Sequence, residues 1–124
     1  MDDFSFRDLI AYKKARNLVK DVYSLAVRRF PMEEKYGLGD QVRRAVVSVP
    51  SNIAEGMSRH SHKEQVHFLE IAYGSLMEVL CQLELASDLQ YITIETLAYL
   101  EKEITEVAKL ISGLRTSIVK KNRD

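Results

Sequence analysis

The chain has 124 residues with 46% hydrophobic and 29% charged side chains, a composition that excludes a disordered or fibrous protein. This length supports one hydrophobic core, so we expect a single domain over 1–124. Eighteen basic residues balance eighteen acidic ones, which argues against a protein that binds polyanions through an overall positive charge.

The single cysteine allows no internal disulfide bond, which is typical of proteins in the reducing cytoplasm. The acidic start of the sequence lacks the apolar segment of a signal peptide. The longest run without a charged residue, 45–54, is much shorter than the ~20 residues of a membrane span. We therefore expect a cytoplasmic protein that does not cross a membrane.

The first predicted helix spans 6–29. Its apolar residues recur at helical spacing on one side, and basic residues lie on the other. Ser5 is expected to cap this helix, with Asp8 three residues later completing a capping box. Phe30 and Pro31 are expected to end it, because proline cannot continue a helix.

The second predicted helix spans 39–58, with Gly39 as its N-cap. Pro50 lies inside this helix and removes one backbone hydrogen bond, which predicts a kink. The alternative is a full break at Pro50, after which Asn52 caps a new helix.

The third and fourth predicted helices span 62–89 and 94–119. Ser61 and Glu64 form a capping box at the start of the third helix, and Thr93 caps the fourth. All connections between helices are short, so neighbouring helices should run antiparallel. The sequence therefore predicts an all-α protein, an up-down-up-down antiparallel four-helix bundle with its second helix kinked at Pro50.

A polar stripe runs beside the apolar side of the second helix, and a shorter one follows the third helix. If these helices form a hairpin that turns near His60, the numbers of facing positions sum to about 122. We then expect a partly buried polar layer that fixes the packing register, with an Arg44–Glu78 ion pair at its centre. Ser48 should face Gly74 and Ser75 across this layer. Binding a ligand or partner is the alternative role. The layer comprises Gln41, Arg44, Ser48, Asn52, Glu55, Ser75, Glu78 and Gln82.

The third helix is also apolar on the side opposite its core stripe, where Tyr73, Met77 and Cys81 lie. A helix that is apolar on two faces is usually buried on both. We therefore expect a homo-oligomer with these three residues near the subunit contact. Scattered apolar residues on a monomer surface are the alternative.

No pattern of catalytic or metal-binding residues emerges. His60, His62 and His67 have no further ligands at suitable spacing, and Cys81 has no histidine partner. Glycine-rich phosphate or dinucleotide motifs do not occur. We expect no metal, no cofactor and no enzymatic activity.

Basic residues are concentrated near the start of the chain. Lys13, Arg16 and Lys20 form an exposed stripe on the first predicted helix, and Arg28 and Arg29 extend it. These five side chains are candidates for contacts with nucleic-acid phosphates, and a solvated surface without a partner is the alternative. An oligomer would repeat the stripe and concentrate its electrostatic field.

Two runs of the sequence carry a family resemblance. The run from Gln41 to Gly56, with the run from Phe68 to Glu78, resembles the four-helix-bundle proteins encoded by intervening sequences in bacterial 23S ribosomal RNA genes. The resemblance covers essentially the whole chain. It implies a bundle that assembles as a homopentameric ring or barrel, in a family without an established catalytic activity.

A related protein, the accessory variability determinant of diversity-generating retroelements, is similar in fold, pentameric and basic, and works with a reverse transcriptase and nucleic acid. The resemblance thus favours a non-enzymatic oligomer that binds RNA or a ribonucleoprotein, or else DNA, through a surface repeated around the ring. The alternative is a protein-interaction scaffold that touches no nucleic acid. An unrecognised enzyme that uses the polar stripe is a third interpretation.

Overall fold

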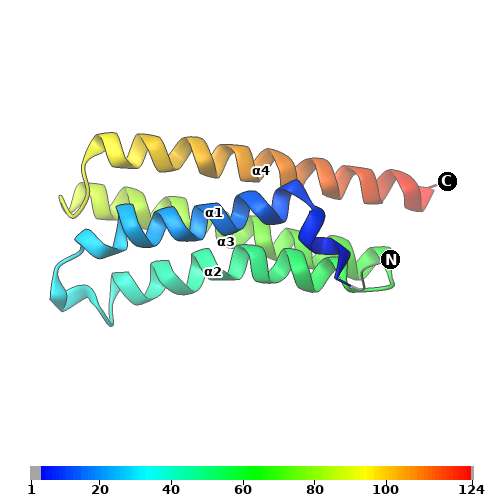
Figure 1. The fold of residues 1–124 in the computed structure, drawn as a ribbon, viewed down its shortest axis with the longest axis horizontal. Coiled ribbons are helices and arrows are strands. Elements are labelled where there is room, and N and C mark those ends of the chain that lie inside the picture. The colour runs from blue at the N-terminus through cyan, green and yellow to red at the C-terminus, as the bar shows by residue number, and fades with distance from the viewer. Residues whose placement is uncertain (1–3, 124) are drawn as a thin grey trace.

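The computed structural model describes residues 4–123, and this part of the chain contains four α-helices and no β-strand. The all-α prediction is therefore confirmed. In Figure 1 the chain direction reverses from each helix to the next, and both ends of the described chain lie at one end of the bundle. The helices are α1 (Ile10–Leu25), α2 (Leu38–Met57), α3 (His62–Asp88) and α4 (Ile94–Arg123), with short 3-10 turns η1 (Ser5–Asp8), η2 (Val27–Arg29) and η3 (Met32–Glu34).

Each helix packs against two neighbours and encloses a shared apolar core. α1 contacts α2 and α4, and α3 contacts the same two helices, whereas the diagonal pairs do not approach each other. The core is aliphatic and its largest members are fully buried. These include Leu18 and Val22 of α1, Val42, Val46, Val49 and Ile53 of α2, Leu69, Leu76 and Leu83 of α3, and Leu100, Ile104 and Ile111 of α4.

The first helix is shorter than predicted. α1 begins only at Ile10, because Leu9 is extended with φ −69° and ψ 132°, and it ends before Ala26 with φ −120°. The expected capping box is wrong, because Ser5 and Asp8 lie together in η1 and no side chain caps either η1 or α1. Phe6 instead folds back so that its ring meets Tyr12 edge-on, with 5.0 Å between centroids.

The start of α2 is held by the turn before it. Gly37 is the N-cap, two residues before the predicted Gly39. The Glu34 carboxylate accepts the backbone N–H of Leu38 at 3.0 Å and the Tyr91 hydroxyl at 2.8 Å. These hydrogen bonds, the backbone one foremost, lower the pKa of Glu34. A Cβ on Gly39 would lie 2.7 Å from the Glu34 carbonyl oxygen, so only glycine allows this close approach.

Pro50 does not interrupt α2. The helix continues from Leu38 to Met57, so the predicted alternative of a full break is wrong. Asn52 does not cap a new helix, because its amide donates to the Ser48 carbonyl at 2.8 Å and to the Ser48 Oγ at 2.9 Å. The kink at Pro50 stays a prediction.

The caps of α3 and α4 are confirmed. Ser61 Oγ accepts the backbone N–H of Glu64 at 3.2 Å, and Thr93 Oγ1 accepts that of Thr96 at 3.1 Å. α4 extends to Arg123, beyond its predicted end at 119. At the turn into α3, a Cβ on Gly56 would lie 2.9 Å from the Phe68 Cβ, so glycine lets α2 and α3 meet closely there.

The end of α3 contains a strained residue. Gln90 has φ 64°, and the hydrogen bonds from Gln90 N to Ser87 O and from Tyr91 N to Ala86 O form a Schellman motif. Glycine normally occupies this left-handed position, because a side chain there costs free energy.

We predict that Gln90→Gly raises the free energy of unfolding by about 1 kcal/mol, because glycine relieves the left-handed strain. Urea unfolding at neutral pH measures this change. Gln90→Ala is the control, since it removes the same amide but keeps the strain. An equal rise in the free energy of unfolding in both variants would show that the Gln90 side-chain amide, and not the backbone conformation, lowers the stability of the native chain.

Candidate functional site

The predicted polar layer forms in part, between α2 and α3. Ser48 Oγ lies 2.7 Å from Ser75 Oγ, as the predicted hairpin register requires. Asn52 adds two hydrogen bonds to Ser48. Gln82 of α3 is buried, and its amide donates to Glu78 at 3.2 Å. Of these hydrogen bonds, the one between Ser48 and Ser75 joins the two helices and holds them in register, whereas the others lie within one helix.

The expected Arg44–Glu78 ion pair is wrong. The Arg44 side chain is 81% exposed, and its Nε lies 3.0 Å from Oδ2 of Asp40 in the same helix. An exposed pair one turn apart avoids the desolvation cost of a buried ion pair. Gln41 and Glu55 are likewise exposed, and Glu55 pairs with Arg59 at 3.0 Å. The layer at the helix contact is therefore smaller than predicted, and uncharged where Ser48, Asn52 and Ser75 meet.

Sequence reasoning missed two carboxyl groups that meet between α1 and α4. Glu103 is half-buried at this seam beside Asp21, and its Oε2 is buried with no hydrogen-bond partner among the described residues. Burial, the neighbouring Asp21 carboxyl group and the negative charge of Glu106 raise the pKa of Glu103 to about 7, against an opposing effect of Lys14. Lys14 itself pairs with Glu106 at 3.2 Å. A signal was present, because Glu103 follows the core residue Leu100 by three positions and precedes Val107 by four, but only apolar residues were assigned to the core face of this helix.

We predict that Glu103→Gln flattens the pH dependence of stability. The folded chain keeps the Glu103 proton up to about pH 7, whereas the unfolded chain releases it near its ordinary pKa of 4.5. The native chain therefore loses stability as the pH rises between these two values. The Tm at pH 5 and at pH 8 should differ less in Glu103→Gln than in the native chain. Glu101→Gln, at an exposed site on α4, is the control, and parallel profiles for both variants would contradict the prediction.

The five predicted nucleic-acid contacts are all exposed. Lys13, Arg16 and Lys20 lie on α1, and Arg28 and Arg29 lie in η2. Within residues 4–121, whose side chains are described, none of the five lies within 4.0 Å of a carboxylate oxygen. Their charges are therefore not neutralised by direct ion pairs, unlike that of Lys14.

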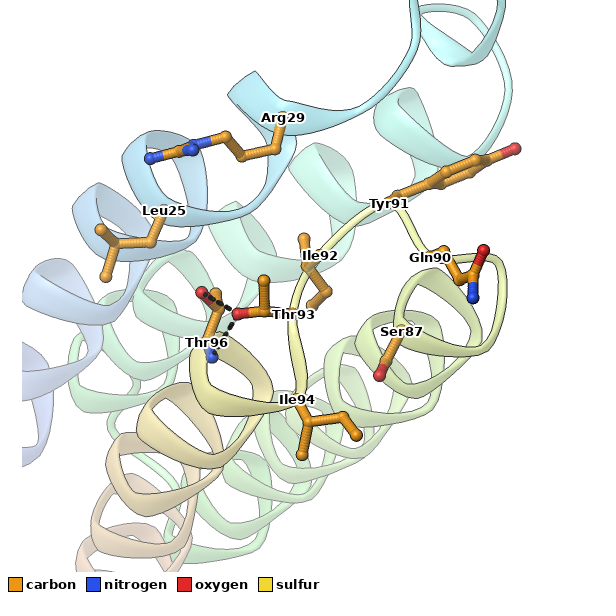
Figure 2. A pocket seen from close by; sticks show the side chains of 9 residues that line it. All are labelled: Leu25, Arg29, Ser87, Gln90, Tyr91, Ile92, Thr93, Ile94 and Thr96. Carbon is orange, nitrogen blue, oxygen red and sulfur yellow. Dashed lines mark hydrogen bonds between the residues drawn. The ribbon is translucent and has the colours of Figure 1, made fainter.

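Arg29 borders a pocket of about 450 Å³ at the end of the bundle where η2 meets the turn between α3 and α4. Figure 2 shows its side chain extending over Leu25, while the Tyr91 hydroxyl points away from Thr93. The Thr93 hydroxyl also donates to Thr96 Oγ1 at 3.0 Å. Arg29 is the charged residue of the lining, so the pocket adds positive charge at this end of the bundle.

The predicted subunit-contact residues lie on an exposed face of α3. Tyr73 is 39% and Met77 36% exposed, and Cys81 is exposed as well. Two depressions of about 330 and 430 Å³ adjoin at Tyr73 and Ser112 and form a largely apolar groove between α3 and α4. A Cβ on Gly74 would meet nothing within 4 Å, so the α3 backbone is open to approach here.

Among the described residues, no group of three or more histidine, cysteine or acidic side chains could hold a metal ion. In the same part of the chain, every helix is too short or too polar to cross a membrane. The strongest features of the surface are thus the basic stripe and the apolar groove between α3 and α4.

These features define a small helical protein with a charged surface and an apolar one. The model of the 23S rRNA-intervening sequence protein family matches residues 7–113, so the chain belongs to this family. A solved structure of a protein of unknown function from the S23 ribosomal protein family of Bacteroides thetaiotaomicron VPI-5482 has a similar fold, with a TM-score of 0.78 and 24% identity. The match covers 86% of this chain and 98% of that one. A comparison with curated proteins gives no match.

Proposed function

We propose that this chain is a non-enzymatic, cytoplasmic protein that binds RNA, free or within a ribonucleoprotein, through the basic residues of α1 and η2. The observation that carries this proposal is that, among the described residues, no direct ion pair is formed by Lys13, Arg16, Lys20, Arg28 or Arg29. Exposed lysines and arginines without such pairs attract phosphates and release the counterions condensed on the nucleic acid.

The distribution of charge matters more here than the net charge of zero. Residues 7–29 hold seven basic side chains but only two acidic ones, Asp8 and Asp21. Asp21 lies beside Glu103 at the α1/α4 seam, and within the described part of the chain it forms no ion pair with the stripe. A local positive field therefore persists on a chain that is neutral as a whole.

Self-association would strengthen such binding. The groove beside Tyr73 and Met77 exposes apolar surface that a second copy would bury, with Cys81 near the contact. A homopentamer, the assembly implied by the family resemblance, would present the stripe five times to one RNA. The family name and the S23 ribosomal title of the similar structure associate such proteins with ribosomal RNA genes or ribosomes, which makes RNA the first nucleic acid to test.

The same groove favours a second candidate function, a scaffold that binds another protein and no nucleic acid. An apolar surface of this kind suits a protein partner as well as a second copy. Salt dependence separates the two functions, because phosphate binding weakens steeply with salt and apolar contacts do not.

We predict that Lys13→Ala/Lys20→Ala weakens binding of labelled single-stranded RNA and lowers the slope of log K against log salt by about 1.4. Fluorescence anisotropy between low and physiological salt measures both quantities. Lys63→Ala/Lys102→Ala is the matched control, since it removes two exposed lysines elsewhere. Equal effects of both pairs would assign binding to another surface, and no binding by the native chain at low salt would leave the scaffold function.

We predict that Met77→Glu reduces the protein to a single chain of 14.2 kDa, because burying an unpaired carboxylate at the subunit contact is costly. Sedimentation equilibrium measures the mass, and the native chain should give a multiple of it. Ile10→Glu makes the same kind of change at an exposed apolar residue outside the groove and should leave the mass unchanged. A native chain that is already monomeric would rule out self-association.

A further inference from the structure

A second groove, between α1 and α2, combines the basic stripe with aromatic and apolar side chains. It has a volume of about 420 Å³. Tyr12, Arg16 and Lys20 of α1 form one wall, Phe6 of η1 closes one end, and α2 forms the opposite wall with Val47 among its residues.

The groove depends on one departure from regular structure and on one exposed valine within a regular helix. The extended residue Leu9 turns η1 back over α1, which places the Phe6 ring against Tyr12. On the opposite wall, Val47 is 41% exposed in the middle of α2, one turn before Ser51. An exposed apolar wall beside two aromatic rings is unusual on a surface that is otherwise charged.

The charges of the groove have one sign. Arg16 and Lys20 line it, and no acidic side chain does. Within the described part of the chain, neither cation is in an ion pair with a carboxylate. The Arg16 guanidinium lies 5.7 Å from the centre of the Tyr12 ring, a loose stacking contact that leaves its hydrogen-bond donors available.

Together these groups match the way in which proteins hold unpaired nucleotides. Single-stranded nucleic acids are bound by cations that track the phosphates and by aromatic or guanidinium planes on which the bases stack. A base-paired duplex keeps its bases stacked inside and offers only its backbone and groove edges to such a site. An acidic peptide would satisfy the cations but has no planar group for Tyr12 and Arg16.

We infer that the groove between α1 and α2 binds an unpaired nucleotide of single-stranded RNA, with its base beside Tyr12 and Arg16 and its phosphate at Lys20. This inference rests on the proposed RNA binding and adds to it a preference for single strands. The charges of the stripe attract any RNA, whereas the groove distinguishes an exposed base from a paired one.

The test compares a labelled oligouridine with an RNA duplex of equal phosphate count. Tyr12→Leu keeps an apolar side chain against Phe6 but removes the stacking surface, so it should weaken oligouridine binding about tenfold and leave duplex binding unchanged. Tyr99→Leu, which removes an exposed tyrosine from α4, is the matched control and should change neither affinity. Circular dichroism confirms that each variant is folded.

A second variant covers the case in which Tyr12→Leu fails to fold. Ser51 is an exposed residue of the groove wall, and Ser51→Asp places a negative charge there without disturbing the core. It should weaken oligouridine binding more than duplex binding, whereas Thr116→Asp, at an exposed site on α4 outside this groove, should affect both equally.

The outcomes separate the inference from the proposed function. If both RNAs bind with a steep salt dependence but Tyr12→Leu and Ser51→Asp leave the oligouridine preference unchanged, RNA binding stands and the groove inference is overturned. A groove that docks a protein would give that same result. If neither RNA binds to the native chain at low salt, the proposed function and the groove inference both fail.

Discussion

The close contact between α2 and α3 determines how the rest of the bundle is built. Gly56 lets the two helices meet closely where the chain turns, because a Cβ there would collide with Phe68. Further along, the hydroxyls of Ser48 and Ser75 meet at 2.7 Å, which fixes which residues face each other. A shift of either helix would break this hydrogen bond and separate Ser75 from Ser48, whereas Ser48 would keep its hydrogen bond from Asn52.

Once this pair is in register, α1 and α4 complete the core and place opposite charges on different sides of α1. The acidic side faces α4, where Asp21 meets Glu103. The basic residues Arg16 and Lys20 border the groove toward α2. α1 thus separates an acidic seam from a basic groove, although the sequence is neutral as a whole.

The sequence predicted those features that depend on neighbouring residues. The caps at Ser61 and Thr93 are local hydrogen bonds, and the facing of Ser48 and Ser75 follows from the turn between two regular helices. The cap at Ser5 failed because the contact between Phe6 and Tyr12 outweighs a local preference. An arginine side chain is long enough to pair within its own helix or with a neighbouring helix. Residue spacing alone therefore could not predict that Arg44 pairs with Asp40 and not with Glu78. Likewise, the raised pKa of Glu103 depends on burial in the folded bundle and then on Asp21, more than eighty residues earlier, and no local sequence pattern predicts that these two residues meet.

The Glu103 carboxyl group at the α1/α4 seam also affects the net charge of the folded molecule. Counting ionised side chains gives a balance of zero and an isoelectric point near 6.8. That count treats Glu103 as fully ionised, but its raised pKa lets the folded chain keep part of a proton there at neutral pH. The folded molecule therefore carries less negative charge at neutral pH than its unfolded chain. Its isoelectric point and its pH of lowest solubility should therefore lie above the value that its sequence implies.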